Sequence, residues 1–234
     1  GLETALGAIR AAQTLPNRHG WRPWAVPGTR ALRLRDEASA KALIAAAGVA
    51  VPRSVTAPSL AALQAMAAGL TAPLALKGLG FAHKTEAGAV RLGLATLDGQ
   101  AEIAGATGYL AEEMVTGVVA ELLVGLRRDP VYGATRTVGF GGVTAELLAD
   151  TATLVLPVTA DDVQAALRGL RLWPLLDGYR GRPRADVDAV VAAVMALQAL
   201  LQATPALEEI EINPLMVRAT GAVAVDAVIW EEEA

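Results

Sequence analysis

Apolar and polar positions alternate with two different periods along this chain. Some segments place apolar residues three or four positions apart, as in an amphipathic helix, whereas others are short apolar runs or alternate at every second position, as in strands. Ser, Thr and Asp before several apolar segments match the residues that cap helix starts. Helices are therefore predicted at residues 3–13, from Asp36 to about 47, from Ser59 to about 69, after the Thr159 and Asp162 pair, and at 186–202.

The strands are predicted from apolar runs bounded by Gly, Pro and Asp. One hairpin is expected to turn at Asp129 and Pro130, and another at Thr220 and Gly221, since these residue types favour tight turns. Helices and strands mixed in this order indicate an α/β fold. The expected extended segments are 49–55, 73–77, 109–115, 118–127, 131–140, 209–217 and 222–230.

Composition narrows the class of protein. The chain has 234 residues, of which 53% are hydrophobic, enough for one large domain or two small ones. A net charge of −4 with scattered basic residues argues against a nucleic-acid partner. The absence of cysteine excludes a disulfide framework, a thiolate metal site and a cysteine nucleophile, and it fits a reducing, cytoplasmic compartment. No apolar run reaches the roughly 18 residues of a membrane span, so no membrane association is expected.

The beginning of the chain has its own character. It starts at Gly1 with neither an initiator methionine nor a signal peptide, which indicates a fragment or a processed protein. Residues 16–24 are broken by Pro and Gly and carry Trp21 and Trp24. Because proline blocks both helix and ladder hydrogen bonds, we expect a linker or arm whose tryptophans dock on another surface.

Lys77 closes an apolar strand and precedes Gly78 and Gly80. An ammonium group in that position can contact a phosphate as a point charge. It can equally lie at a sheet edge with its stem over apolar surface. His83 follows soon after, and a neutral imidazole can accept a phosphoryl group, although a single histidine is more often structural.

Three carboxylates lie on the next predicted strands. Glu112 and Glu113 are adjacent, so they face opposite sides of their strand and only one can line a given site. Glu121 has apolar neighbours, and an inward carboxylate would need a ribose hydroxyl, a metal or a basic side chain as partner. A solvated glutamate at a sheet edge is the alternative.

Two further segments favour phosphate and metal binding. Gly141 and Gly142 precede a short helix expected to end near residue 149, and backbone N–H groups at a helix start can bind an anion. Glu209, Glu211 and Asn213 alternate on one face of a strand, and the last hairpin would bring Asn213 near Asp226. Such oxygen ligands suit Mg²⁺. Neither a Walker A motif nor GxGxxG occurs, which disfavours P-loop and Rossmann sites.

Taken in order, several segments resemble one family. They are "GVAVP", "PLALKG", "HKTEAGAVRLGL", "EEMV", "ELLVGLRRDPVYG", "GFGGVTAELLAD", "LLDGYRGRP" and "EIEINPLMV", preceded by a helix with Glu37 and Lys41. Over residues 36–230 the chain resembles the ATP-grasp domain of ADP-forming acetyl-CoA or acyl-CoA synthetases, which are related to the succinyl-CoA synthetase β subunit. Its first 30 or so residues resemble the linker that joins this domain to the CoA-ligase part in single-chain members.

The resemblance implies an ATP-grasp fold with nucleotide held between two α/β subdomains. It suggests an arm at 1–30 and an ATP-grasp domain at 31–234, with a small subdomain at about 51–111 and a large one at 31–50 and 112–234. It implies the reaction of acyl-CoA, ADP and phosphate to acid, CoA and ATP, through an acyl phosphate and a phosphohistidine. The partner would be a CoA-binding part, in the same polypeptide or in a separate α subunit, which carries the main phosphohistidine.

Site roles also follow from the resemblance, residue by residue, with Mg²⁺ and ATP or ADP as the bound groups. Lys77, Gly141 and Gly142 would hold phosphate, and Glu121 would contact the ribose. Asn213 and Asp226 would bind Mg²⁺. His83 would relay the phosphoryl group, and Glu211 would steady the incoming phosphohistidine. The adenine would lie against a hinge formed by Glu112, Glu113, Met114 and Val115.

The sequence departs from the family pattern at three places. Glu86 replaces the usual aspartate after the histidine, Ala89 replaces a glycine, and the stretch between Leu94 and Tyr109 is short enough to lack a helix. Two alternatives stay open beside the synthetase. One is a ligand-sensing ATP-grasp module of a larger regulatory protein such as a protein acetyltransferase. The other is an amide-forming ATP-grasp ligase, against which the His83 motif argues.

Overall fold

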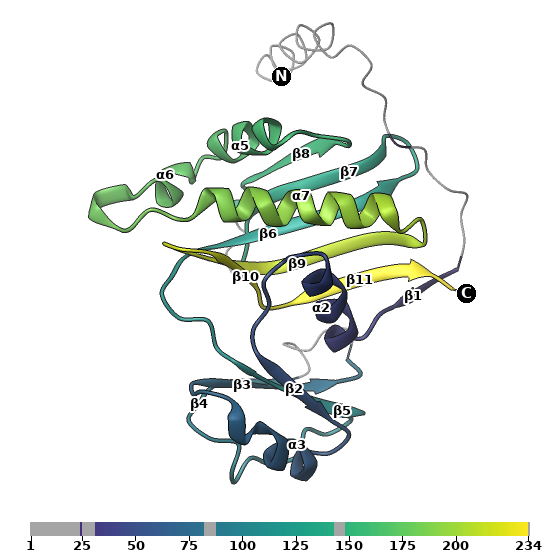
Figure 1. The fold of residues 1–234 in the computed structure, drawn as a ribbon, viewed down its shortest axis with the longest axis vertical. Coiled ribbons are helices and arrows are strands. Elements are labelled where there is room, and N and C mark those ends of the chain that lie inside the picture. The colour runs from purple at the N-terminus through teal and green to yellow at the C-terminus, as the bar shows by residue number, and fades with distance from the viewer. Residues whose placement is uncertain (1–23, 25–30, 82–87, 143–147, 234) are drawn as a thin grey trace, which may run out of the picture.

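The computed structural model describes residues 24, 31–81, 88–142 and 148–233. Within them the strands form two antiparallel sheets, one above the other in Figure 1. This arrangement confirms the predicted mixed α/β class. None of the helices in these ranges is long and apolar enough to cross a membrane.

The larger sheet has seven strands in the order β1-β11-β9-β6-β7-β8, with β10 also paired to β9. Helices α2 (Glu37–Ala46) and α7 (Val187–Ala203) pack against it, α2 on β11 and α7 on β6 and β9. Smaller helices, α5 (Ala160–Arg168), α6 (Trp173–Leu176) and the 3-10 turn η3 (Tyr179–Gly181), lie between β8 and α7 in the chain. The strand bounds are β1 Leu32–Leu34, β6 Val118–Asp129, β7 Gly133–Phe140, β8 Thr151–Val155, β9 Leu207–Arg218, β10 Ala222–Ala224 and β11 Ala227–Glu232.

The smaller sheet has four strands in the order β2-β5-β3-β4. Helix α3 (Leu60–Met66) and the 3-10 turn η2 (Ala67–Gly69) cover it. The segment 114–117 leads from β5 into β6 and so joins the two sheets (Figure 1). The strand bounds are β2 Ser54–Ala57, β3 Leu74–Leu79, β4 Val90–Leu94 and β5 Gly108–Glu113.

The helix starts predicted at Asp36, Ser59 and Thr159 are confirmed, because each is closed by the expected side chain, whereas the helix predicted at 3–13 lies outside the described residues. Asp36 accepts the N–H of Ser39 at 3.0 Å, and Ser59 accepts that of Ala62 at 3.2 Å. Thr159 and Asp162 form a reciprocal capping box. Such side chains satisfy backbone N–H groups that a first helical turn leaves without partners.

Several strand predictions need correction. The segment expected at 49–55 is strand only from Ser54 onward, and the one at 131–140 begins at Gly133, because Asp129 accepts the N–H groups of Val131 and Tyr132 and closes the turn. Strands β1, β4 and β8 and helix α6 have no sequence prediction. The stretch 95–107, all of it described, contains no helix, as expected.

The last predicted strand, 222–230, is wrong as a single element. It is divided into β10 and β11, with Val225 and Asp226 between them. The reason lies opposite the break, where Pro214 stands within β9 and, as a proline, has no N–H to offer the neighbouring strand. Asp226 therefore lies in a break and not within a strand.

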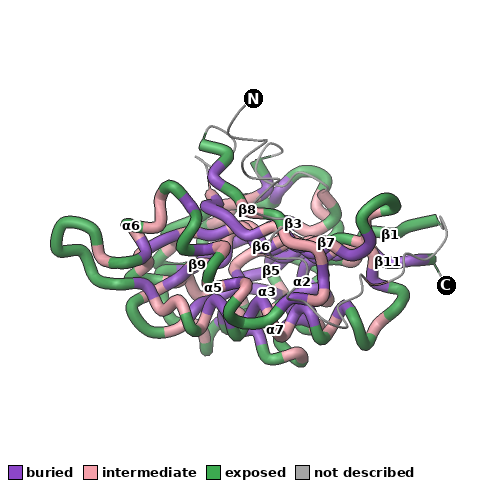
Figure 2. The backbone as a smooth tube through the Cα atoms, turned by 90° about the horizontal axis from the view of Figure 1, so that it is seen from above, coloured by how far each residue is buried: buried purple, intermediate pink, exposed green. Residues whose placement is uncertain are grey.

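Each of the two sheets packs on an apolar core of its own. The larger one is formed by β6, β7, β9 and α7 with Ala40 and Ile44 of α2, and the smaller one by α3 and the small sheet. Figure 2 shows the buried residues along the central strands and the exposed ones on the outer loops. Trp24 packs against the larger core, as the docking prediction required, whereas Trp21 and the rest of the predicted arm lie outside the described residues.

Candidate functional site

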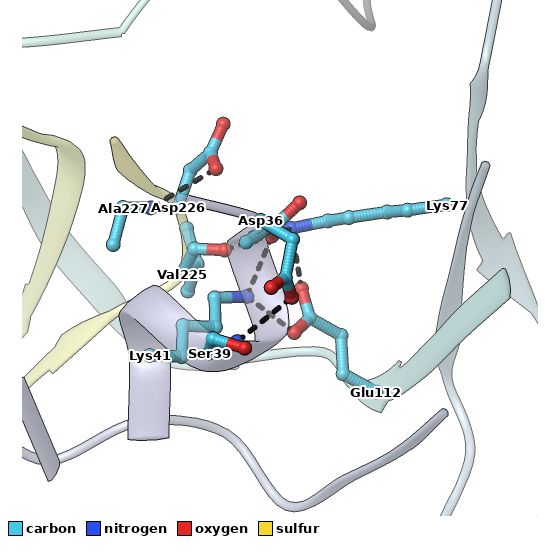
Figure 3. Close-up of polar contacts among 9 residues, drawn as sticks. Asp36, Ser39, Lys41, Lys77, Glu112, Val225, Asp226 and Ala227 are labelled. Carbon is cyan, nitrogen blue, oxygen red and sulfur yellow. Dashed lines mark hydrogen bonds and ion pairs between the residues drawn. The ribbon is translucent and has the colours of Figure 1, made fainter. Parts of the chain in front are cut away.

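Helix α2 faces the space between the two sheets with a stripe that is half apolar and half charged. Glu37, Ala40, Lys41 and Ile44 follow the spacing of one helix face, and all four are buried. Lys77 lies in β3 and Glu112 in β5, which pair side by side in the small sheet. These strands direct both side chains toward α2 (Figure 3).

Two lysines and two glutamates meet there in a closed ring, which we call the four-charge ring: Glu37, Lys41, Lys77 and Glu112. The Lys77 ammonium lies 2.7 Å from Glu37 Oε1 and 2.6 Å from Glu112 Oε1. The Lys41 ammonium lies 2.9 Å from the same Glu37 oxygen and 2.5 Å from Glu112 Oε2. Side-chain exposure is 8% for Lys77 and 4% or less for the other three.

The electrostatics of the ring favour charged lysine. Burial by itself would lower the pKa of Lys77, but the carboxylates of Glu37, Glu112 and Asp226 act in the opposite direction and raise that pKa above its ordinary value. The ammonium is therefore charged at neutral pH. Its interaction with Asp226 also places the ring within electrostatic range of the predicted metal ligand.

A backbone carbonyl completes the coordination of Lys77. The ammonium donates to Val225 O at 2.8 Å. Val225 lies opposite Pro214, and its own N–H donates to Pro214 O at 3.3 Å. In an antiparallel pair of this kind the partner would return a second N–H bond, which proline cannot supply. The Val225 carbonyl is thereby left available to the lysine.

The glycine turn after β7 meets two of the predicted polar residues. Gly141 N–H donates to Glu121 O at 2.9 Å, and Gly142 N–H donates to Asn213 Oδ1 at 3.2 Å. The Gly142 backbone lies so close to the Glu121 carboxylate that a Cβ there would clash with it. Strands β7, β6 and β9 are neighbours in the sheet, which is why these four residues converge.

An acidic face continues along β9. The pairing of Ala224 with Leu215 and of Ala227 with Ile212 places Asp226 opposite Asn213, as the hairpin predicted. The pKa of Glu211 is raised by burial, and then by the charges of Glu209 and Asp226. Asp226 Oδ1 accepts the N–H of Ala227 at 3.0 Å. No cluster of three or more His, Cys, Asp or Glu that could bind a metal occurs among the described residues.

Residues 112–115, the predicted adenine hinge, form hydrogen bonds and ion pairs with other parts of the chain. Glu113 accepts hydrogen bonds from the Arg53 side chain and the Thr71 N–H, and Met114 N–H donates to Pro73 O at 2.8 Å. The Glu112 side chain points into the four-charge ring and so away from a hinge role of its own. Val115 is partly exposed in the segment between the sheets.

The structure thus brings together most of the predicted site. Glu121, Gly141, Gly142 and Asn213 form one group, and Asp226 and Glu211 lie on the adjoining face. His83 lies outside the described residues, as does most of the helix predicted after Gly142. Sequence reasoning assigned no site role to Glu37 and Lys41. Their signal was present, since a charged pair four residues apart occupies the same stripe as Ala40 and Ile44.

Comparisons with known proteins agree with this geometry. The family described as the ATP-grasp domain matches residues 29–230. A trans-feruloyl-CoA synthase from an unknown prokaryotic organism is 34% identical over 229 residues, which cover 90% of this chain and 32% of that protein. The beta subunit of an ADP-forming acetate–CoA ligase II from Pyrococcus furiosus is 28% identical over 209 residues, covering 82% of this chain and 89% of that subunit.

Solved structures point the same way. A dinucleotide-forming acetyl-coenzyme A synthetase 1 from Ca. Korarchaeum cryptofilum has a TM-score of 0.73 and 27% identity, covering 84% of this chain and 92% of that chain. That structure is a complex with coenzyme A and Mg-AMPPCP, and its phosphohistidine segment points towards the nucleotide binding site.

Proposed function

Because this chain belongs to the ATP-grasp domain family, we propose that it is the nucleotide-binding, phosphoryl-transfer part of an ADP-forming acyl-CoA synthetase. The whole reaction would convert acyl-CoA, ADP and phosphate to acid, CoA and ATP. The observation that carries the proposal is the convergence of Glu121, Gly142, Asn213 and Asp226 beside the ring that contains Lys77. Ligase relatives support the synthetase over the ligand-sensing alternative.

Asn213 and Asp226 fit a magnesium ion by the chemistry of their donors. Both supply oxygen, they lie opposite one another on β9 and the β10–β11 break, and Glu211 adds negative charge nearby. Magnesium commonly takes one or two protein ligands and completes its shell with water and phosphate oxygens. When bound, it would neutralise part of the phosphate charge. The Mg-AMPPCP complex of the related synthetase supports this assignment.

The remaining residues would bind and orient the nucleotide. Gly141 and Gly142 would offer backbone N–H groups to phosphate, and the Lys77 ammonium would add positive charge. Glu121 would accept a ribose hydroxyl, and the backbone of residues 112–115 would border the adenine. On this scheme the two sheets correspond to a small subdomain at about 51–111 and a large one at 31–50 and 112–234. Positioning and electrostatics supply most of the catalysis in such transfers.

The proposed partner is a CoA-binding part, either fused or separate. The chain spans 32% of the length of the trans-feruloyl-CoA synthase, whereas it spans 89% of a separate beta subunit. Its relatives therefore include both a much longer protein and a separate beta subunit of similar length. In our proposal His83 would relay the phosphoryl group, and Glu211 would steady a phosphohistidine brought by that partner. The phosphohistidine segment of the related structure supports such a route.

Calorimetric titration of the purified chain with ADP and ATP, with and without Mg²⁺, tests the proposal. We expect magnesium-dependent binding that weakens about tenfold in Asp226→Ala, or about 1.4 kcal/mol, because Asp226 would be one of only two protein ligands of the ion. Arg184→Met is the matched control, because the Arg184 side chain is 77% exposed and its polar contacts within the described residues are to Asp177 alone, at 3.4 Å to the carboxylate and 3.1 Å to the carbonyl. Binding that ignores both magnesium and the Asp226 substitution would contradict the assignment.

A further inference from the structure

The use of lysine in this chain is unusually selective. Of its 20 basic residues only three are lysines, namely Lys41, Lys77 and Lys84. Two of these three lie in the four-charge ring. An ammonium group is compact and has three N–H donors, whereas a guanidinium is a wide planar fork that pairs best with one carboxylate at a time. The ring therefore needs lysine at both positions.

The ring is electroneutral and closely satisfied. Each lysine contacts both carboxylates, and each glutamate contacts both ammonium groups, at 2.5–2.9 Å. Removing one member of a buried ion pair leaves an uncompensated charge, which is far more costly than removing a whole pair. Each ammonium group is therefore held where it contacts both carboxylates, and the second lysine holds those carboxylates in place.

The ring also joins three parts of the molecule. Glu37 and Lys41 come from α2, whose Ala40 and Ile44 belong to the larger core. Lys77 and Glu112 come from the smaller sheet. The third N–H of Lys77 reaches Val225 O, in the break whose next residue is Asp226 (Figure 3). A shift of α2 would therefore move the lysine relative to Asp226.

We propose that Glu37 and Lys41 are positioning residues of the nucleotide site, which hold the Lys77 ammonium against the β10–β11 break that presents Asp226. This inference rests on the proposed function, because it assigns a role at the same site. The role is indirect, since Glu37 and Lys41 act through the ion pairs that they make within the ring. Lys77 has three N–H donors and three acceptors in the ring and at Val225, so it acts on phosphate through its charge while those contacts persist.

The first test compares nucleotide affinity between variants that do and do not balance the charge. Lys41→Met leaves one excess buried negative charge beside Lys77 and Asp226. We expect the Kd for Mg-ADP to rise about tenfold. The double variant Lys41→Met/Glu112→Gln removes one charge of each sign and keeps the Lys77–Glu37 pair, so it should recover most of that loss. Arg184→Met, which removes an exposed cation, should bind as the unsubstituted protein does.

The second test does not depend on nucleotide. In protein labelled with ¹⁵N only in lysine, the side-chain ammonium of a buried, paired lysine exchanges slowly with water and gives an observable NMR signal. Signals from Lys41 and Lys77 are expected in the free protein, and each is assigned by its loss in Lys41→Met or Lys77→Met. Lys41→Met should also shift the Lys77 signal, and the double variant should move it back toward its original position.

The outcomes separate the two proposals. Absence of Mg-ADP binding by the unsubstituted chain would sink the proposed function, while the ammonium spectrum would still report on the ring. If Lys41→Met lowers stability yet leaves both the Kd and the Lys77 signal unchanged, Lys41 is merely structural and the positioning role is overturned. Should the single variant fail to fold, the double variant decides instead: a Kd about tenfold above that of the unsubstituted chain together with an unshifted Lys77 signal would overturn the positioning role.

Discussion

At the scale of single residues, the site depends on a proline without a backbone N–H and on a glycine without a Cβ. Pro214 lacks an N–H, which leaves the Val225 carbonyl to Lys77. Gly141 lacks a Cβ, and one placed there would lie 2.7 Å from the carbonyl carbon of Leu122 and 2.8 Å from its oxygen. Backbone atoms held in a sheet cannot move away as a flexible side chain can. Only glycine therefore allows the turn to approach β6 so closely.

A matched pair of alanine substitutions tests this explanation. Gly141→Ala should lower the free energy of unfolding by about 1–3 kcal/mol, the usual effect of overpacking. Gly125→Ala is the control, because Gly125 lies in β6 and a Cβ there would meet nothing within 4 Å. It should be neutral or slightly stabilising. Urea denaturation followed by circular dichroism measures both, and equal effects would refute the close approach as the cause.

At the scale of elements, one aspartate ties a helix to a hairpin. Asp186 caps α7 by accepting the N–H of Ala189 at 3.0 Å, and its second oxygen accepts the N–H of Gly221 at 2.8 Å. These two bonds, that to Gly221 first, hold the pKa of Asp186 below its ordinary value. The start of α7 and the turn between β9 and β10 are therefore held by the same carboxylate.

The pH dependence of stability gives a direct test. Asp186→Ala should lower the free energy of unfolding by about 1 kcal/mol near neutral pH, as for other lost caps. Because the folded-state pKa is depressed, the ionised carboxylate stabilises above the unfolded-state pKa, and this contribution fades as pH falls through the folded-state value. The gap between the two proteins should thus narrow below about pH 4. Asp186→Asn, which keeps one acceptor, should lose less, and a gap independent of pH would speak against the mechanism.

At the scale of the whole molecule, two cores share no residue. Leu63 is fully buried in the smaller core and Leu197 in the larger one. The four-charge ring and two chain segments, 47–53 and 114–117, connect the parts that contain them. We infer that each core can be perturbed separately.

Hydrogen exchange of two cavity variants tests this independence. Leu63→Ala and Leu197→Ala should each cost about 2–5 kcal/mol, as for buried leucines in general. Leu63→Ala should speed amide exchange mainly within residues 54–113, because its core contains no residue of the larger sheet. Leu197→Ala should speed it mainly within 118–232. Uniform acceleration in either variant would mean that the two sheets unfold as one unit.

Much of the secondary structure was predictable, for a local reason. Asp36, Ser59 and Thr159 cap helices through bonds to residues three positions away, so the sequence carries both partners. The opposition of Asn213 and Asp226 also followed from a hairpin, whose register is set by a short turn. The short strands β1, β4 and β8 escaped prediction because their pairing, and not their own pattern, makes them strands.

By itself, then, the sequence determined the helix starts, the two hairpins, the α/β class and the family resemblance, all of which depend on residues close in the chain or on their order. Only the tertiary structure decided that Gly142 meets Asn213 and that Glu37, Lys41, Lys77 and Glu112 share one ring. Those contacts join residues up to 71 positions apart, as in the Lys41–Glu112 and Gly142–Asn213 pairs. Their charges attract wherever they meet, but the order and packing of the sheets decide which of them do.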